Sequence, residues 1–153
     1  MRFLIIFFTL FFLIGCRENI TENIVTKNQA ITKTKKKEVT IDGRRFLAVG
    51  TYLNDISHPS TPKDDNEHFI VSLYEGDENP YQNPLKEVFL NEEPAYWEVL
   101  EKGDPFLNLL PLFNAWGYYY HIWAPKQYPD EMQLDIKIDE ERQVSLKFQK
   151  DPK

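Results

Sequence analysis

The chain has 153 residues and a formal net charge of −6, and this length predicts one domain once the two ends are set aside. It contains one cysteine, which excludes an internal disulfide. Residues 38–153 carry 11 basic and 22 acidic side chains, a net charge of −11, which argues against nucleic acid as a partner because phosphate binding needs a clustered positive face.

Residues 1–15 are predicted to form a signal peptide that is removed from the mature protein. Arg2 supplies a short positive start, and residues 3–14 form an almost unbroken apolar run. A membrane-spanning helix needs about 20 apolar residues, so this run suits the hydrophobic region of a secretory signal better. A retained anchor helix and a buried N-terminal element are the alternatives. The short length weighs against the first, and the lack of a polar stripe against the second.

The residues Leu13-Ile14-Gly15-Cys16 complete this signal. They resemble the lipobox of bacterial lipoproteins, which is read by signal peptidase II. The resemblance covers residues 1–16 only. It implies that Cys16 is lipidated with a diacylglycerol, that the chain is cut before it, and that the new amino group is acylated. The protein would then be held in the cell envelope by its N-terminal lipid, and Arg17 in place of aspartate suggests the outer membrane, facing the periplasm.

Residues 16–37 are predicted to be the lipidated cysteine followed by a disordered basic tether. Polar side chains dominate this stretch, so it cannot bury enough apolar surface to order itself. Residues 17–37 carry six basic and two acidic side chains, a net charge of +4. A basic segment beneath an acidic domain suits a membrane with anionic head groups, and a plain solvated linker is the alternative.

Residues 38–153 are predicted to be a single, mainly β domain. Alternating or β-rich runs bounded by turn formers predict strands at 39–42, 46–53, 69–74, 85–90, 118–123, 134–138 and 144–148. A short helical segment is expected near 95–110, where Asp104 can cap a turn that begins at Pro105. Short strands with few helical patterns favour an antiparallel β-sandwich or a partly open barrel.

The aromatic strand 118–123 provides the candidate binding surface. If Tyr120 and its alternate neighbours face inward, then Tyr119, His121 and Trp123 form an outward row, with Trp116 just before it. Aromatic side chains with polar handles are enriched where proteins meet. The alternative is that a second layer, such as the segment around Trp97, covers the row.

No motif in the chain supports catalysis. The serines lack a nucleophile context, no glycine loop could cradle phosphate, and the spacing of His58, His68 and His121 shows no convergence. No cofactor or metal is therefore predicted, and lipidation of Cys16 would remove the only thiol. The prediction is a non-catalytic protein-binding or envelope-assembly module with an envelope protein as partner. The alternatives are a hydrolase of an envelope polymer that uses Asp/Glu pairs, and an adhesion domain stabilised by calcium in the acidic loops 64–67, 75–79 and 139–141.

Overall fold

The computed structural model describes residues 24–152, apart from 42, 76–84, 115, 116, 139 and 141. Two antiparallel sheets pack against each other, which confirms the predicted mainly β fold. The strands are β1 (Thr34–Ile41), β2 (Arg44–Tyr52), β3 (Asn66–Glu75), β4 (Glu87–Leu90), β5 (Glu93–Pro94), β6 (Tyr96–Val99), β7 (Tyr118–Pro125), β8 (Glu131–Lys137) and β9 (Gln143–Gln149).

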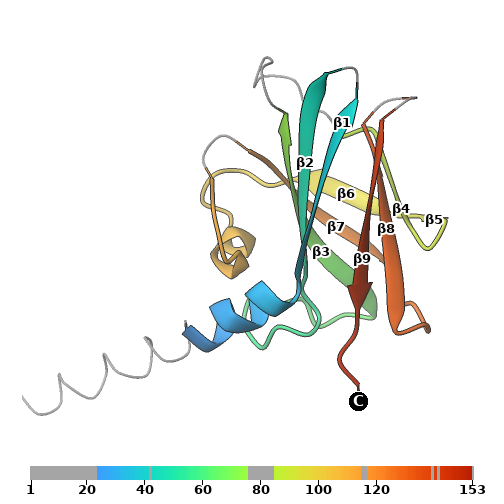
Figure 1. Ribbon diagram of the computed structural model, residues 1–153. Helices are drawn as coiled ribbons and strands as arrows, with labels where there is room; N and C mark the ends of the chain where they lie inside the picture. Colours follow the sequence, from blue (N-terminus) through green and yellow to red (C-terminus); the bar gives the residue numbers. More distant parts are fainter. Residues whose placement is uncertain are drawn as a thin grey trace, which may run out of the picture.

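The two sheets are arranged like a barrel that is open along one seam. One sheet has the order β1-β2-β3-β7-β6 and the other β5-β4-β8-β9. Only Ala95 separates β5 from β6, so the chain passes from one sheet to the other at this corner. On the opposite side β9 lies close to β1 (Figure 1), and no ladder joins these two strands in the described part of the chain.

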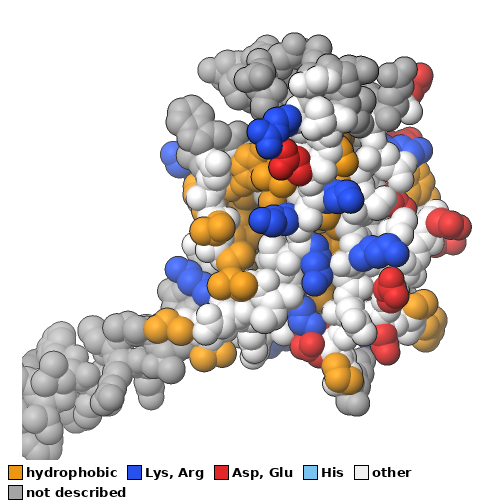
Figure 2. Space-filling view, in the orientation of Figure 1, with side chains coloured by type: hydrophobic (Ala, Val, Ile, Leu, Met, Phe, Trp, Pro, Cys, Tyr) orange, Lys and Arg blue, Asp and Glu red, His pale blue; other side chains and the backbone are white. Residues whose placement is uncertain are grey.

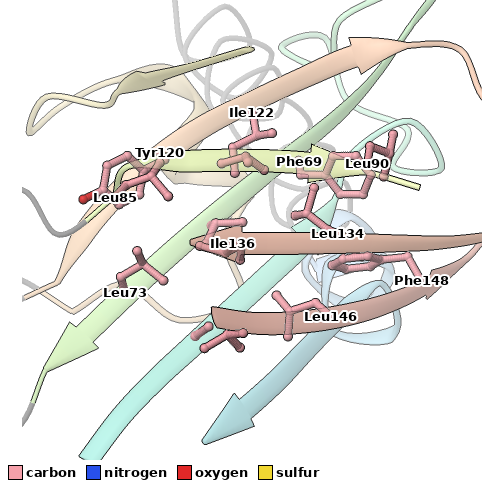
Figure 3. Packing of buried hydrophobic residues seen from close by; sticks show 14 of the residues in the cluster. Phe69, Leu73, Leu85, Leu90, Tyr120, Ile122, Leu134, Ile136, Leu146 and Phe148 are labelled. Atoms are coloured by element: carbon pink, nitrogen blue, oxygen red, sulfur yellow. The ribbon is translucent and has the colours of Figure 1, made fainter. Parts of the chain in front are cut away.

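The core lies between the sheets and follows the alternation of each strand. Residues from β2, β3 and β7 meet those from β4, β8 and β9 (Figure 3). Gly50 on β2 allows this approach, because a Cβ there would lie 2.7 Å from Leu146 Cδ1 and 2.9 Å from Phe148 Cζ. The largest fully buried side chains in this core are Phe69, Leu73, Leu90, Tyr120, Ile122, Met132, Leu134 and Ile136.

The expected helical segment is present as a short 3₁₀ helix, η1 (Pro105–Leu109). Asp104 is its N-cap, and its Oδ1 accepts a hydrogen bond from the Phe106 backbone N–H at 2.9 Å. The capping prediction is therefore confirmed. Trp97 falls in the range 95–110 where the helical segment was expected, but it lies in β6 and packs against the main core.

The N-terminal boundary of the domain differs from the expectation. Residues 24–32 are helical and β1 begins at Thr34, so the prediction of a disordered tether up to residue 37 is wrong for residues 24–37. The helix buries Thr26 and Ala30, which share one face. The three lysines that follow Thr34 are exposed on β1, which is an edge strand of its sheet. Cys16 and the rest of residues 1–23 lie outside the described residues. Within 24–152, no helix combines the length and apolar character needed to cross a bilayer.

Candidate functional site

The aromatic row lies on the face of the five-stranded sheet that points away from the main core. Alternation along β7 places Tyr120 and Ile122 in the core between the sheets. Tyr119, His121 and Trp123 therefore share the opposite face, as the sequence predicted. Trp116, the fourth residue of the predicted surface, lies outside the described residues.

This face is largely covered, so the predicted outward row requires correction. Tyr119 is 4% exposed and His121 is 7% exposed, and only Trp123 is partly exposed. The cover is provided by η1 and its flanking residues, with help from the helix 24–32 and the loop after β2. The alternative, a layer that covers the row, therefore holds for Tyr119 and His121, but this layer is not the segment around Trp97. The covering side chains and the sheet residues beneath them form a second apolar cluster, which is separate from the main core. Its members are Ala30, Leu53, Ile56, Ile70, Leu100, Phe106, Leu107, Leu109, Leu110 and Tyr119.

Two buried histidines under this cover are bonded to each other and to two exposed carboxylates, which makes a chain of four polar side chains. His68 Nδ1 is 3.0 Å from His121 Nε2. His68 Nε2 is 2.7 Å from Asp64 Oδ1, and His121 Nδ1 is 3.0 Å from Glu98 Oε1. The two imidazoles are nearly parallel, with 8° between their planes, and the Phe106 ring centroid lies 4.5 Å from that of His121. The result is a carboxylate–imidazole–imidazole–carboxylate chain that joins β3, β7 and β6.

The hydrogen bonds in this chain determine its protonation. Ionised carboxylates only accept, so His68 Nε2 and His121 Nδ1 must each carry a proton. Burial lowers the pKa of His121, an effect that its hydrogen bond to Glu98 opposes and that the charge on His68 reinforces. Burial thus makes the His121 imidazole harder to protonate than an exposed one.

The hydrogen bonds of Asp64 lower its pKa. The hydrogen bond from His68, with a second from the Asn66 backbone N–H, lowers the pKa of Asp64 to about 2. All four imidazole nitrogens are thus engaged, and none is free to act as a general base. Nor does the described part of the chain contain a group of three or more His, Cys, Asp or Glu residues that could hold a metal ion.

A second buried polar cluster surrounds Glu67, which is 2% exposed. Its carboxylate lies 2.6 Å from Lys150 Nζ, accepts from the Tyr52 hydroxyl at 2.6 Å, and accepts from the Gln127 backbone N–H at 3.0 Å. Burial by itself would raise the pKa of Glu67, but these hydrogen bonds outweigh burial and lower it. Burial and the same carboxylate raise the pKa of Tyr52. This cluster borders an open pocket of about 500 Å³.

Where the structure describes the acidic loops proposed to bind calcium, their carboxylates bond to basic side chains of the protein. In the loop 64–67, Asp64 bonds to His68 and Glu67 to Lys150. Most of the loop 75–79, and two of the three residues of 139–141, lie outside the described residues. Sequence reasoning missed the convergence of Asp64, His68 and Glu98, for which the only local signal was the four-residue spacing of the first two.

Trp123 is the part of the aromatic row that reaches the surface. It stacks on Tyr96 of β6, with 5.9 Å between ring centroids and 22° between planes. Tyr96 is 62% exposed and Val99, at the other end of the strand, is 47% exposed. In the ladders that the structure describes, β6 pairs with β7 on one side and has no strand on the other.

No protein-family model matches the chain, and neither a curated protein nor a solved structure shows a significant match to it. The described residues offer two surfaces with exposed apolar side chains, one at β6 and one beside the helix 24–32.

Proposed function

We propose that this protein is a lipid-anchored lipoprotein of the bacterial cell envelope that binds another envelope protein and does not catalyse a reaction. The lipobox ending at Cys16 supports the anchor. The observation that supports protein binding is the free side of β6, where exposed aromatic and aliphatic side chains lie beside a strand with one neighbour.

Such an edge suits an extended segment of another protein. An unpaired strand offers backbone N–H and C=O groups in register, and a partner strand can bind by continuing the sheet. Tyr96 and Trp123 would add an aromatic contact next to that new strand, since their stacked rings remain accessible. Aromatic residues of this type contribute most of the binding energy at many protein interfaces.

The acids that converge in the described structure bond to basic side chains. Glu67 bonds to Lys150. Asp55 and Asp151 each lie 2.6 Å from the same Lys33 Nζ. Asp64 and Glu98 both bond to the histidine pair. A hydrolase that uses two carboxylates needs one of them protonated near neutral pH, and none of these contacts favours that state. These pairings support a binding role over the hydrolytic one.

Site-specific photocrosslinking tests the binding role in the native envelope. A benzophenone amino acid at Tyr96 should give a discrete adduct with one protein, because the side chain would lie in the interface. Lys147, which is exposed on β9 in the other sheet, is the matched control position. Adducts that are identical at the two positions, or absent at Tyr96, would contradict binding at β6.

A further inference from the structure

A second apolar surface lies on a different part of the molecule. Among the described residues, eight large hydrophobic side chains are exposed, and five of them belong to the helix 24–32 or to the loop after η1. The five are Ile24, Val25, Ile31, Leu112 and Phe113, with Leu112 the most exposed at 85%. We call these residues, with the groove between them, the helix–loop face.

The helix presents its apolar side chains to solvent for a geometric reason. Thr26 and Ala30 fill its buried face. Ile24 and Ile31 are seven residues apart, so they lie on one face, separated by about 10 Å along the axis and pointing away from the buried side. Their 56% and 58% exposure agrees with this geometry. Nothing in the packing of the domain requires isoleucine at these positions.

An open apolar groove joins the helix to the loop. It has a volume of about 760 Å³ and is bordered by Ile31 on one side and Leu112 on the other. Its floor is the outer face of the first three strands, including Leu47, Val49 and Tyr74. Figure 2 shows hydrophobic side chains gathered on this side of the molecule, with Lys and Arg side chains beside them.

The loop that carries Leu112 is held in place. The Tyr119 hydroxyl accepts from the Asn114 backbone N–H at 2.6 Å and donates to the Asn114 carbonyl at 2.9 Å. Phe113 stacks on the Tyr119 ring, with 5.1 Å between centroids. These contacts fix the loop in a position that leaves Leu112 projecting into solvent.

The charges around this face are basic, although the domain as a whole is acidic. Lys36 lines the groove, and Lys27, one helical turn before Ile31, is exposed on the helix, whereas Lys35 and Lys37 alternate to the opposite face of β1. Glu38 follows them on β1, and its carboxylate lies 2.6 Å from the Arg45 guanidinium. Exposed apolar side chains flanked by lysines are the composition that binds an anionic lipid surface.

We propose that the helix–loop face lies on the bilayer that holds the acylated Cys16, with Leu112 and Ile31 inserted at the level of the head groups. This inference rests on the proposed anchor. Residues 17–23 separate Cys16 from Ile24, and an extended chain spans this interval with about 28 Å at most. The part of the domain that cannot move far from the anchor is thus the part with exposed isoleucines and lysines.

Fluorescence quenching on the full-length mature lipoprotein tests this orientation. Acylation blocks the thiol of Cys16, so Leu112→Cys provides one free thiol for an NBD label. Lys147→Cys, on the exposed face of β9, is the matched control. The labelled proteins are placed in phosphatidylcholine–phosphatidylglycerol vesicles that contain a nitroxide-labelled lipid. We expect the label at 112 to be quenched about threefold more than the label at 147, and Ile31→Asp to reduce that quenching.

The possible outcomes distinguish the orientation of the domain from the lipid anchor on which it depends. If the protein does not float with the vesicles, the anchor is absent and both proposals fail. If it floats but the labels at 112 and 147 are quenched equally, the anchor stands and the orientation is overturned. If the label at 112 is shielded from solvent only at high protein density, the face binds a second copy of the chain. That result would also overturn the proposal. Both test positions are exposed, so the variants should keep their melting temperature.

Discussion

His68 Nδ1 lies 3.0 Å from His121 Nε2, and each ring also bonds to a carboxylate from another segment. The pair connects β3 to β7 and, through Glu98, to β6. The cover formed by η1 closes over it, since Phe106 packs on the His121 ring. The polar chain thus stabilises the part of the sheet from which the β6 edge projects.

Removing His121 should destabilise the domain. His121→Leu keeps most of the side-chain volume but leaves His68 Nδ1 without its hydrogen-bond partner, which costs about 1–3 kcal/mol in a buried position. Urea denaturation followed by tryptophan fluorescence measures the change. Tyr128→Ala, at a side chain that is 98% exposed, should shift stability by less than about 0.5 kcal/mol. Equal midpoints for the two variants would contradict a stabilising role for the pair.

The same pair predicts how stability depends on pH. Burial lowers the pKa of His121 below its ordinary value of 6.5, so the unfolded chain binds a proton there that the folded protein does not. Stability should therefore fall as the pH drops below 6.5 towards the folded pKa. Asp64 adds a loss in the same direction at lower pH, between 3.8 and about 2.

Denaturation midpoints measured from about pH 7.5 to about pH 5 test this dependence. His121→Leu should flatten the profile over this interval relative to the unmodified protein. The acids facing His121 are Glu98, on β6, and Asp104, at the start of η1; they raise its pKa and limit the size of the slope. A profile that rises as the pH falls would show that the pair gains a proton on folding, contrary to the assignment made from burial.

Breaking the buried pair of Glu67 and Lys150 should cost more than breaking an exposed one. Glu67→Gln leaves the Lys150 ammonium, 13% exposed, without its carboxylate, and a loss of about 3 kcal/mol is expected. Adding Lys150→Met should recover part of this loss, giving a coupling energy in a double-mutant cycle. Glu131→Gln, in an exposed pair with Lys147 at 3.7 Å, is the control and should cost less than about 1 kcal/mol. Equal losses for the two pairs would mean that the buried pair contributes nothing beyond a surface contact.

The sequence predicted the strands wherever alternation was regular. The runs around Leu134 and Leu146 became β8 and β9 with the expected buried faces. The alternation in β7 also placed Tyr119, His121 and Trp123 correctly on one face. These features could be predicted because a strand repeats every two residues and the apolar positions mark its buried side.

The cover over that face could not be predicted in the same way. It depends on contacts between residues distant in sequence, such as Ala30 with the cluster around Leu109. The chain of Asp64, His68, His121 and Glu98 likewise depends on the registers of β3 with β7 and of β6 with β7. A shift of one residue in either ladder would send these side chains to opposite faces, and no local pattern determines those registers.

The most direct test of the account is the mass of the mature N-terminus, measured on protein purified from its native membrane. We predict a polypeptide that begins at Cys16 and carries a thioether-linked diacylglycerol, and a Cys16→Ser variant that remains uncut and lacks the lipid. A mature chain that still begins at Met1, or a Cys16→Ser variant with unchanged processing and membrane fractionation, would contradict the lipid anchor and the orientation inferred from it.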